Sequence, residues 1–243
     1  MISTLIEGVL ETRSNFILAA GAVCTLTAAT MLLLMRNADI ATRQQRIFAA
    51  IWVAIVAGVG VWTTHFVAML GYRPDAALTY DLQLTLISIL VGVLLVGVPL
   101  AGTMFITEDR TRIIFGMIAG LGVAAMHLTG MSAIENCLAT YNPFVLALGV
   151  IAGMGGFTFA MLQDLSVHGS HLRKGAGIVG GVCALHFVAM AAVSLDQVEA
   201  AVRGIGGSFL SILVAIISLA VFTMAMLATF NHRRTLAQLR AGV

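Results

Sequence analysis

Seven apolar stretches, each about as long as a bilayer is thick, constrain the fold of this chain more than any other feature. They lie at about residues 14–35, 47–70, 82–106, 113–134, 143–163, 175–195 and 208–230, and a transmembrane helix needs about 20 such residues. The chain is 60% hydrophobic and 10% charged, whereas soluble domains average about 45–50% and about 25%. The sequence therefore predicts an all-α, polytopic membrane protein, with residues 1–243 forming a single seven-helix domain.

The basic residues lie mostly on one side of the predicted bundle. Of thirteen Lys and Arg residues, only Arg13, Arg73 and Arg203 fall on the opposite side. Connections rich in Lys and Arg face the cytoplasm in most membrane proteins. We therefore expect the N-terminus outside and the C-terminal tail, residues 231–243, in the cytoplasm. The ten cations expected on the cytoplasmic side are Arg36, Arg43, Arg46, Arg110, Arg112, Arg173, Lys174, Arg233, Arg234 and Arg240.

An internal repeat runs through the chain. His65, His127 and His186 are separated by 62 and 59 residues, so each interval covers two membrane spans. A glycine stands five residues before each histidine, a valine four before it and a methionine four after it. Self-similarity at a fixed period indicates repeated structural units, and units that span twice keep the same orientation, as in parallel transporter repeats. We predict one initial helix followed by three copies of a two-helix unit.

Two local features predict how these helices pack. Pro99 lies inside the third apolar stretch, where a missing N–H predicts a kink. Small residues four apart allow helix backbones to approach closely, and the chain has Gly116-x-x-x-Gly120 and Gly177-x-x-x-Gly181 beside two of the histidine motifs.

The three histidines are the strongest candidates for a functional site. Ionisable side chains are costly inside a membrane and usually mark function. Residues four apart lie on one face of a helix, so each histidine shares a face with the methionine that follows it. Neutral imidazoles and thioethers form a soft ligand set that favours copper. The predicted metal ligands are His65, Met69, His127, Met131, His186 and Met190, with Met126 as an additional thioether.

Other interpretations of the same residues stay open. The repeat could preserve histidine and methionine for assembly alone, because methionine commonly fills gaps in apolar interiors. Three nitrogens and a water would suit zinc rather than copper. We interpret Cys24, Cys137 and Cys183 as small buried residues rather than ligands.

The middle copy, Met126-His127-Leu128-Thr129-Gly130-Met131, resembles the signature of the MHYT family of bacterial integral-membrane sensor domains. The resemblance extends over about residues 12–232. It implies a seven-span domain of the bacterial inner membrane that binds copper and, through it, a diatomic gas such as oxygen, carbon monoxide or nitric oxide. The implied ligand roles fall on the six histidines and methionines of the three motifs and on Met126.

This chain departs from the family signature at two motif positions. Phe66, Leu128 and Phe187 stand where the signature has tyrosine, so no phenolic hydroxyl is expected beside the metal. Thr64 and Leu185 replace the leading methionine in the first and third copies. Family members often carry cytoplasmic domains that make or degrade cyclic di-GMP. The resemblance therefore implies such a domain or partner outside this chain.

The leading hypothesis is a copper-binding membrane sensor that is not an enzyme. Its expected partners are the lipid bilayer, a metal ion and a diatomic gas, and no nucleic acid. A copper transporter or permease is the first alternative, and haem-based electron transfer with two histidines as axial ligands is the second. A zinc hydrolase would need a general base, and Glu135 is the nearest acidic candidate to His127.

Overall fold

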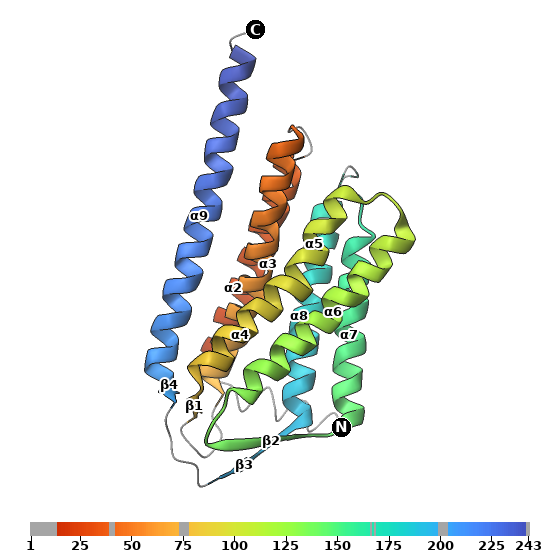
Figure 1. Ribbon diagram of the computed structural model, residues 1–243. Coiled ribbons are helices and arrows are strands. Elements are labelled where there is room, and N and C mark those ends of the chain that lie inside the picture. Colours follow the sequence, from red (N-terminus) through yellow and green to blue (C-terminus); the bar gives the residue numbers. More distant parts are fainter. Residues whose placement is uncertain are drawn as a thin grey trace.

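Seven helices long and apolar enough to cross a membrane form the body of the molecule (Figure 1). The computed structural model describes residues 14–38, 42–72, 78–165, 167, 169–198 and 204–241, the last eleven as backbone only. The predicted all-α, multi-pass membrane fold is confirmed. The seven helices are α2 (Ser14–Ala38), α3 (Arg43–Gly71), a third, composite helix (Leu82–Phe105), α6 (Asp109–Ser132), α7 (Pro143–Met161), α8 (Ser170–Ala192) and α9 (Gly207–Ala241).

The bundle has two distinct ends. We call one the arginine end, because α3, α6 and α8 begin there and carry Arg43, Arg110 and Arg173 in their first turns. Several of the charges used to predict orientation lie outside the described side chains, so the orientation of the termini stays a prediction. Those charged residues are Arg13, Arg73, Arg203, Arg233, Arg234 and Arg240.

The opposite end, which we call the sheet end, carries two small antiparallel sheets (Figure 1). One pairs β1 (Thr79–Tyr80) with β4 (Ile205–Gly206). The other pairs β2 (Cys137–Tyr141) with β3 (Val193–Gln197), in a register that sets Cys137 opposite Gln197. These strands were not predicted. Strand pairing supplies hydrogen-bond partners for the backbone N–H and C=O groups of segments that lie beyond the helix ends.

The third helix is irregular in the middle. It consists of α4 (Leu82–Gly92), the π-helical turn η1 (Val93–Gly97), α5 (Val98–Gly102) and the short 3₁₀ turn η2 (Thr103–Phe105). The π turn ends just before Pro99, whose missing N–H breaks the regular ladder. The irregular turn thus lies next to the residue at which the sequence predicts a kink.

Glycines bring neighbouring helices into backbone contact. A Cβ on Gly116 or Gly120 would overlap the backbone of α7 at Thr158 or Met154, and one on Gly177 would lie 2.9 Å from the Gly156 carbonyl oxygen. The predicted close packing at both glycine motifs is confirmed.

Helix α3 lies at the centre and α9 at the periphery. In α3, 67% of the most apolar stretch is buried, against 17% in α9. Trp62 of α3 is fully buried, and its Nε1 donates to Ser88 Oγ at 3.0 Å and to the Thr85 carbonyl at 3.2 Å. These bonds anchor the central helix to α4.

We expect Trp62→Phe to lower the free energy of unfolding by about 1–3 kcal/mol, because it removes a buried hydrogen-bond donor and leaves space. Thermal unfolding of the purified protein in detergent measures the effect. Trp52→Phe, at a half-buried position of the same helix, is the matched control and should cost less. Equal losses in the two variants would contradict the role assigned to Trp62.

Candidate metal centre

The three predicted histidines converge at one point inside the bundle. His65 of α3, His127 of α6 and His186 of α8 are 2%, 1% and 7% exposed. His65 Nδ1 lies 3.1 Å from His127 Nδ1 and 3.3 Å from His186 Nδ1. The ring centroids are 4.8–5.3 Å apart and every pair of rings is close to perpendicular. We call this group the His triad.

Hydrogen bonds alone do not account for this arrangement. A neutral imidazole nitrogen has either one in-plane hydrogen or one in-plane lone pair. His65 Nδ1 faces two other ring nitrogens at 3.1 and 3.3 Å, so it can make only one good hydrogen bond of the two. A cation shared among the three nitrogens would satisfy all of them.

The spacing of the nitrogens fits a single metal ion. Metal–nitrogen bonds of about 2.0–2.1 Å in a tetrahedral site set two ligand nitrogens about 3.3–3.4 Å apart. The two short separations in the His triad are close to this value, and one nitrogen from each ring lies within 4.8 Å of the others. Imidazole nitrogen is a suitable ligand for both copper and zinc. The donor set therefore fits an ion held by three imidazoles.

The same spacing disfavours haem. A porphyrin plane has to lie between its two axial nitrogens, and nitrogen atoms 3.1 Å apart leave no room for it.

The surroundings of the His triad are apolar. The ring of Phe66 packs edge-on against His65 at 4.7 Å, and Phe187 does the same to His186 at 5.2 Å. Two of the positions at which the family signature has tyrosine therefore supply phenyl rings to the site. An apolar shell controls solvent access and the properties of a bound metal.

Gly130 makes room for His65. A Cβ built on Gly130 would lie 2.7 Å from His65 Nε2. The Nε2 atoms of His65 and His127 are buried and have no hydrogen-bond partner within the described part of the chain. Ring nitrogens opposite a metal usually donate to an acceptor, so here packing against Gly130 and Phe66 takes the place of that hydrogen bond in orienting His65.

The predicted methionine ligands are buried on the same three helices. Met69, Met131 and Met190 are 2%, 1% and 5% exposed, one helical turn from the histidines toward the sheet end. Met126 is 1% exposed, and its Cγ lies 3.5 Å from the position that a Cβ on Gly92 would take, so it packs against α4. The ligand roles of all four thioethers stay predictions.

Two of the cysteines that the sequence analysis interprets as small buried residues lie together near the site, with Cys24 buried and Cys183 half-buried. The Cys24 thiol of α2 lies beside Cys183 and beside Thr64, the neighbour of His65. Cys183 stands three residues before His186 on α8, and this spacing was the one sequence signal for its position. Cys137 lies apart from this pair, buried in β2 at the sheet end.

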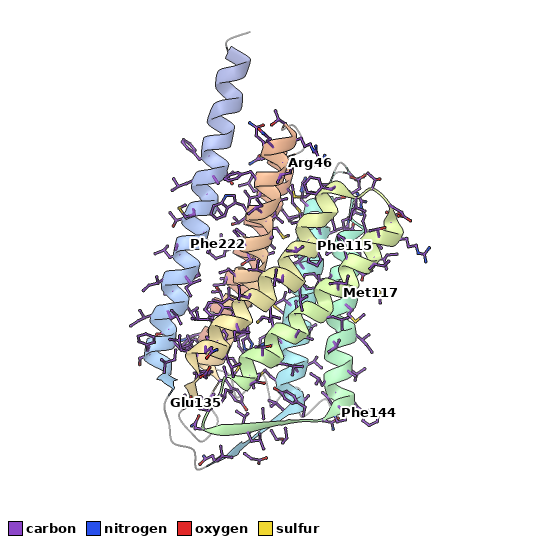
Figure 2. All side chains as sticks on the ribbon, viewed as in Figure 1. Arg46, Phe115, Met117, Glu135, Phe144 and Phe222 are labelled. Carbon is purple, nitrogen blue, oxygen red and sulfur yellow. The ribbon has the colours of Figure 1, made fainter. Side chains whose placement is uncertain are left out.

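No acidic residue joins the His triad among the described residues. The group that could hold a metal consists of the three histidines alone. Glu135, the candidate general base, lies beyond α6 at the sheet end (Figure 2). Among the described residues, the His triad therefore lacks the acidic general base that a zinc hydrolase would need.

Tyr80 closes the sheet end of the site. Its ring lies 6.0 Å from that of Phe66, and only 2% of the residue is exposed. Burial raises the pKa of the Tyr80 hydroxyl, with a smaller contribution from nearby Cys137, so this side chain is neutral at physiological pH.

The comparisons with known proteins point to bacterial signalling. The MHYT family, described as a bacterial signalling protein N-terminal repeat, matches residues 58–116 and 180–242. These stretches start 122 residues apart, twice the two-span interval, and contain His65 and His186. His127 lies between the two matches. No solved structure matches the chain.

Among curated relatives, the chain is 32% identical to the bifunctional diguanylate cyclase/cyclic di-GMP phosphodiesterase MucR of Pseudomonas aeruginosa, over 74% of this chain and 28% of the relative. It is 34% identical to the cyclic di-GMP phosphodiesterase NbdA of the same organism, over 60% of this chain and 20% of that protein. The signaling protein YkoW of Bacillus subtilis is 25% identical over 59% of this chain and 19% of its own length.

The chain thus spans only 28% of the length of MucR and 20% of that of NbdA. The repeated His–Met motifs, the seven helices and the family match over residues 58–116 and 180–242 agree with one another. The chain belongs to the MHYT family of bacterial signalling proteins.

Proposed function

We propose that this chain is a copper-binding sensor domain of the bacterial inner membrane, with its N-terminus outside and the arginine end in the cytoplasm. The observation that carries the proposal is the convergence of three buried imidazole nitrogens on one point, with separations of 3.1 and 3.3 Å between two pairs. Positive-inside asymmetry supports the orientation.

His65, His127 and His186 hold the ion in this proposal, and Met69, Met131 and Met190 supply thioethers from the next turn. Thioethers beside imidazoles favour copper over zinc. A bound copper ion would supply a redox couple and an open position for a diatomic gas. The buried ring of Phe66 and the half-buried ring of Phe187 limit the access of bulk water to it.

The signal leaves the site through the helices that carry the histidines. Helices α3, α6 and α8 all run from the arginine end to the His triad. A ligand shifts a conformational equilibrium only by its differential affinity for the two states, so gas binding or oxidation has to favour one arrangement of these three helices. A cyclic di-GMP enzyme domain or partner at the arginine end responds to the change in this proposal, as the activities of the relatives MucR and NbdA suggest.

Metal analysis of the purified chain tests the proposal. Protein prepared without histidine-tag chemistry and loaded with Cu(I) should retain about one copper per chain after dialysis. A triple variant, H65A/H127A/H186A, should retain almost none. Carbon monoxide should give the loaded wild-type protein an infrared C–O band that the triple variant lacks.

Equal copper in both proteins would contradict the metal site. Copper retention without any response to carbon monoxide or to oxidation would leave the metal site standing and contradict gas and redox sensing.

A further inference from the structure

A cavity at the arginine end is lined by several positively charged side chains. It has a volume of about 550 Å³ and lies where η2, the start of α6 and the connection between α7 and α8 meet. Its charged lining residues are Arg46, Arg112, Lys174 and Asp164. Three cations against one carboxylate leave a net charge of +2. Pockets of about 300–1,000 Å³ are the usual size of small-ligand sites.

Lys174 shows that this cavity is built into the fold. The residue is only 4% exposed, on the second turn of α8. Lys174 and Asp164 each have an interaction partner. Burying an ammonium group is costly unless it is compensated. Since Asp164 is the only carboxylate in the described lining, the cavity keeps an excess of positive charge even when the two are paired.

Arg46 is held in place at the wall of the cavity. Its guanidinium donates to the Met104 carbonyl and lies 5.4 Å from the centre of the Phe105 ring. Its Nε is buried without a hydrogen-bond partner in the described part of the chain. Figure 2 shows Arg46 at the arginine end of α3. Buried N–H groups are normally hydrogen-bonded, so an acceptor atom of a bound ligand would stabilise this one.

Arg112 approaches from the other side. Its Nε donates to the Ile106 carbonyl at 3.1 Å, and one terminal nitrogen lies 3.8 Å from the Asp109 carboxylate. Its side chain is 21% exposed, whereas that of Asp109 is 75% exposed, outside the cavity lining. A guanidinium has five N–H donors, so these contacts fix Arg112 without using all of them.

The helix ends add to the positive potential. Helices α3, α6 and α8 all begin at this end, and N-termini carry partial positive charge and free N–H groups. The N-caps of α6 and α8, Glu108 and Gly169, make no side-chain capping bond.

We propose that this cavity binds a phosphate group, carried either by an anionic lipid headgroup or by a soluble phosphate compound. A net charge of +2 matches a phosphate better than a single carboxylate, and fixed guanidinium groups suit phosphate oxygens. The proposal does not rest on the metal centre, because none of its residues belongs to the His triad.

Two arms of one experiment test the site and identify the source of the phosphate. In the first arm, the full chain in phosphatidylcholine nanodiscs is titrated with pyrophosphate by calorimetry. In the second arm, thermal unfolding is compared between phosphatidylcholine nanodiscs and nanodiscs that contain phosphatidylglycerol. Binding in the first arm indicates a soluble compound, and stabilisation in the second indicates a lipid.

Arg112→Gln and Lys174→Gln should weaken the response in the positive arm about tenfold, since each removes a charge-assisted hydrogen bond. Arg110→Gln, which removes an exposed arginine from the same first turn of α6, should behave as wild type. Lys174→Arg keeps the charge and should retain binding. If Lys174→Gln does not fold, Arg112→Gln against Arg110→Gln decides the result.

No response in either arm would overturn the proposal. So would an equal response from wild type and Arg112→Gln, because the arginines would then serve only to hold the segment after α5 in place.

Discussion

Replacing His65 with alanine should weaken copper binding by at least about a hundredfold. His65 Nδ1 lies 3.1 Å from His127 Nδ1 and 3.3 Å from His186 Nδ1. Without His65, only two imidazoles remain to bind the ion. Changes in residues that merely support a metal ligand already cost about 10–100-fold, and loss of a ligand should cost more. Competition with a chromogenic Cu(I) chelator measures the affinity.

His171→Ala is the matched control for this experiment. It removes an imidazole from the first turn of α8, outside the metal-binding group, and should leave copper affinity unchanged. If His65→Ala bound copper as tightly as His171→Ala, the His triad would not be the ligand set.

Gly130→Ala should damage the metal centre without removing any ligand. The new Cβ would lie 2.7 Å from His65 Nε2, so the ring has to move out of its place in the His triad. Overpacking of this kind costs about 1–3 kcal/mol of stability. Displacement of an imidazole by a few tenths of an ångström should also weaken copper binding about 10–100-fold. Chelator competition and thermal unfolding of the apoprotein measure the two effects separately.

The control for Gly130 is Gly180→Ala on α8, where a Cβ would meet nothing within 4 Å. Alanine is also a better helix former than glycine, so this variant should be as stable as wild type or slightly more so. Wild-type copper affinity in Gly130→Ala would show that His65 does not depend on that space.

The helices and the meeting of the histidines could be predicted from the sequence, because both follow from periodicity. Seven apolar stretches of bilayer length leave no other fold class, since backbone polar groups in lipid need helices or closed barrels. Intervals of 62 and 59 residues, each covering two spans, place His65, His127 and His186 at a similar depth of helices that run in the same direction. A helix that carries a costly imidazole has to turn it inward.

Features that depend on the rotation of individual helices could not be predicted. The contact between Cys24 and Cys183 requires the rotation of α2 against α8, and α2 has no histidine motif to indicate it. The contact of Met126 with Gly92 on α4 likewise depends on the rotation of α6, because adjacent residues on a helix point about 100° apart. The β1–β4 sheet escaped prediction since Thr79–Tyr80 and Ile205–Gly206 are too short for alternation to be visible.

The β2–β3 sheet has a mechanical consequence. It ties together the chain segments that follow α6 and α8, the helices of His127 and His186, immediately beyond Ala192. At 1.5 Å per residue, His186 lies about 9 Å from that tie and Ser170 about 33 Å. A rigid tilt of α8 about Ala192 that displaces the imidazole by about 1 Å therefore swings the opposite tip by about 3–4 Å. Helix α8 would thus act as a lever that pivots near His186, so that a small movement of the imidazole becomes a larger one at the arginine end.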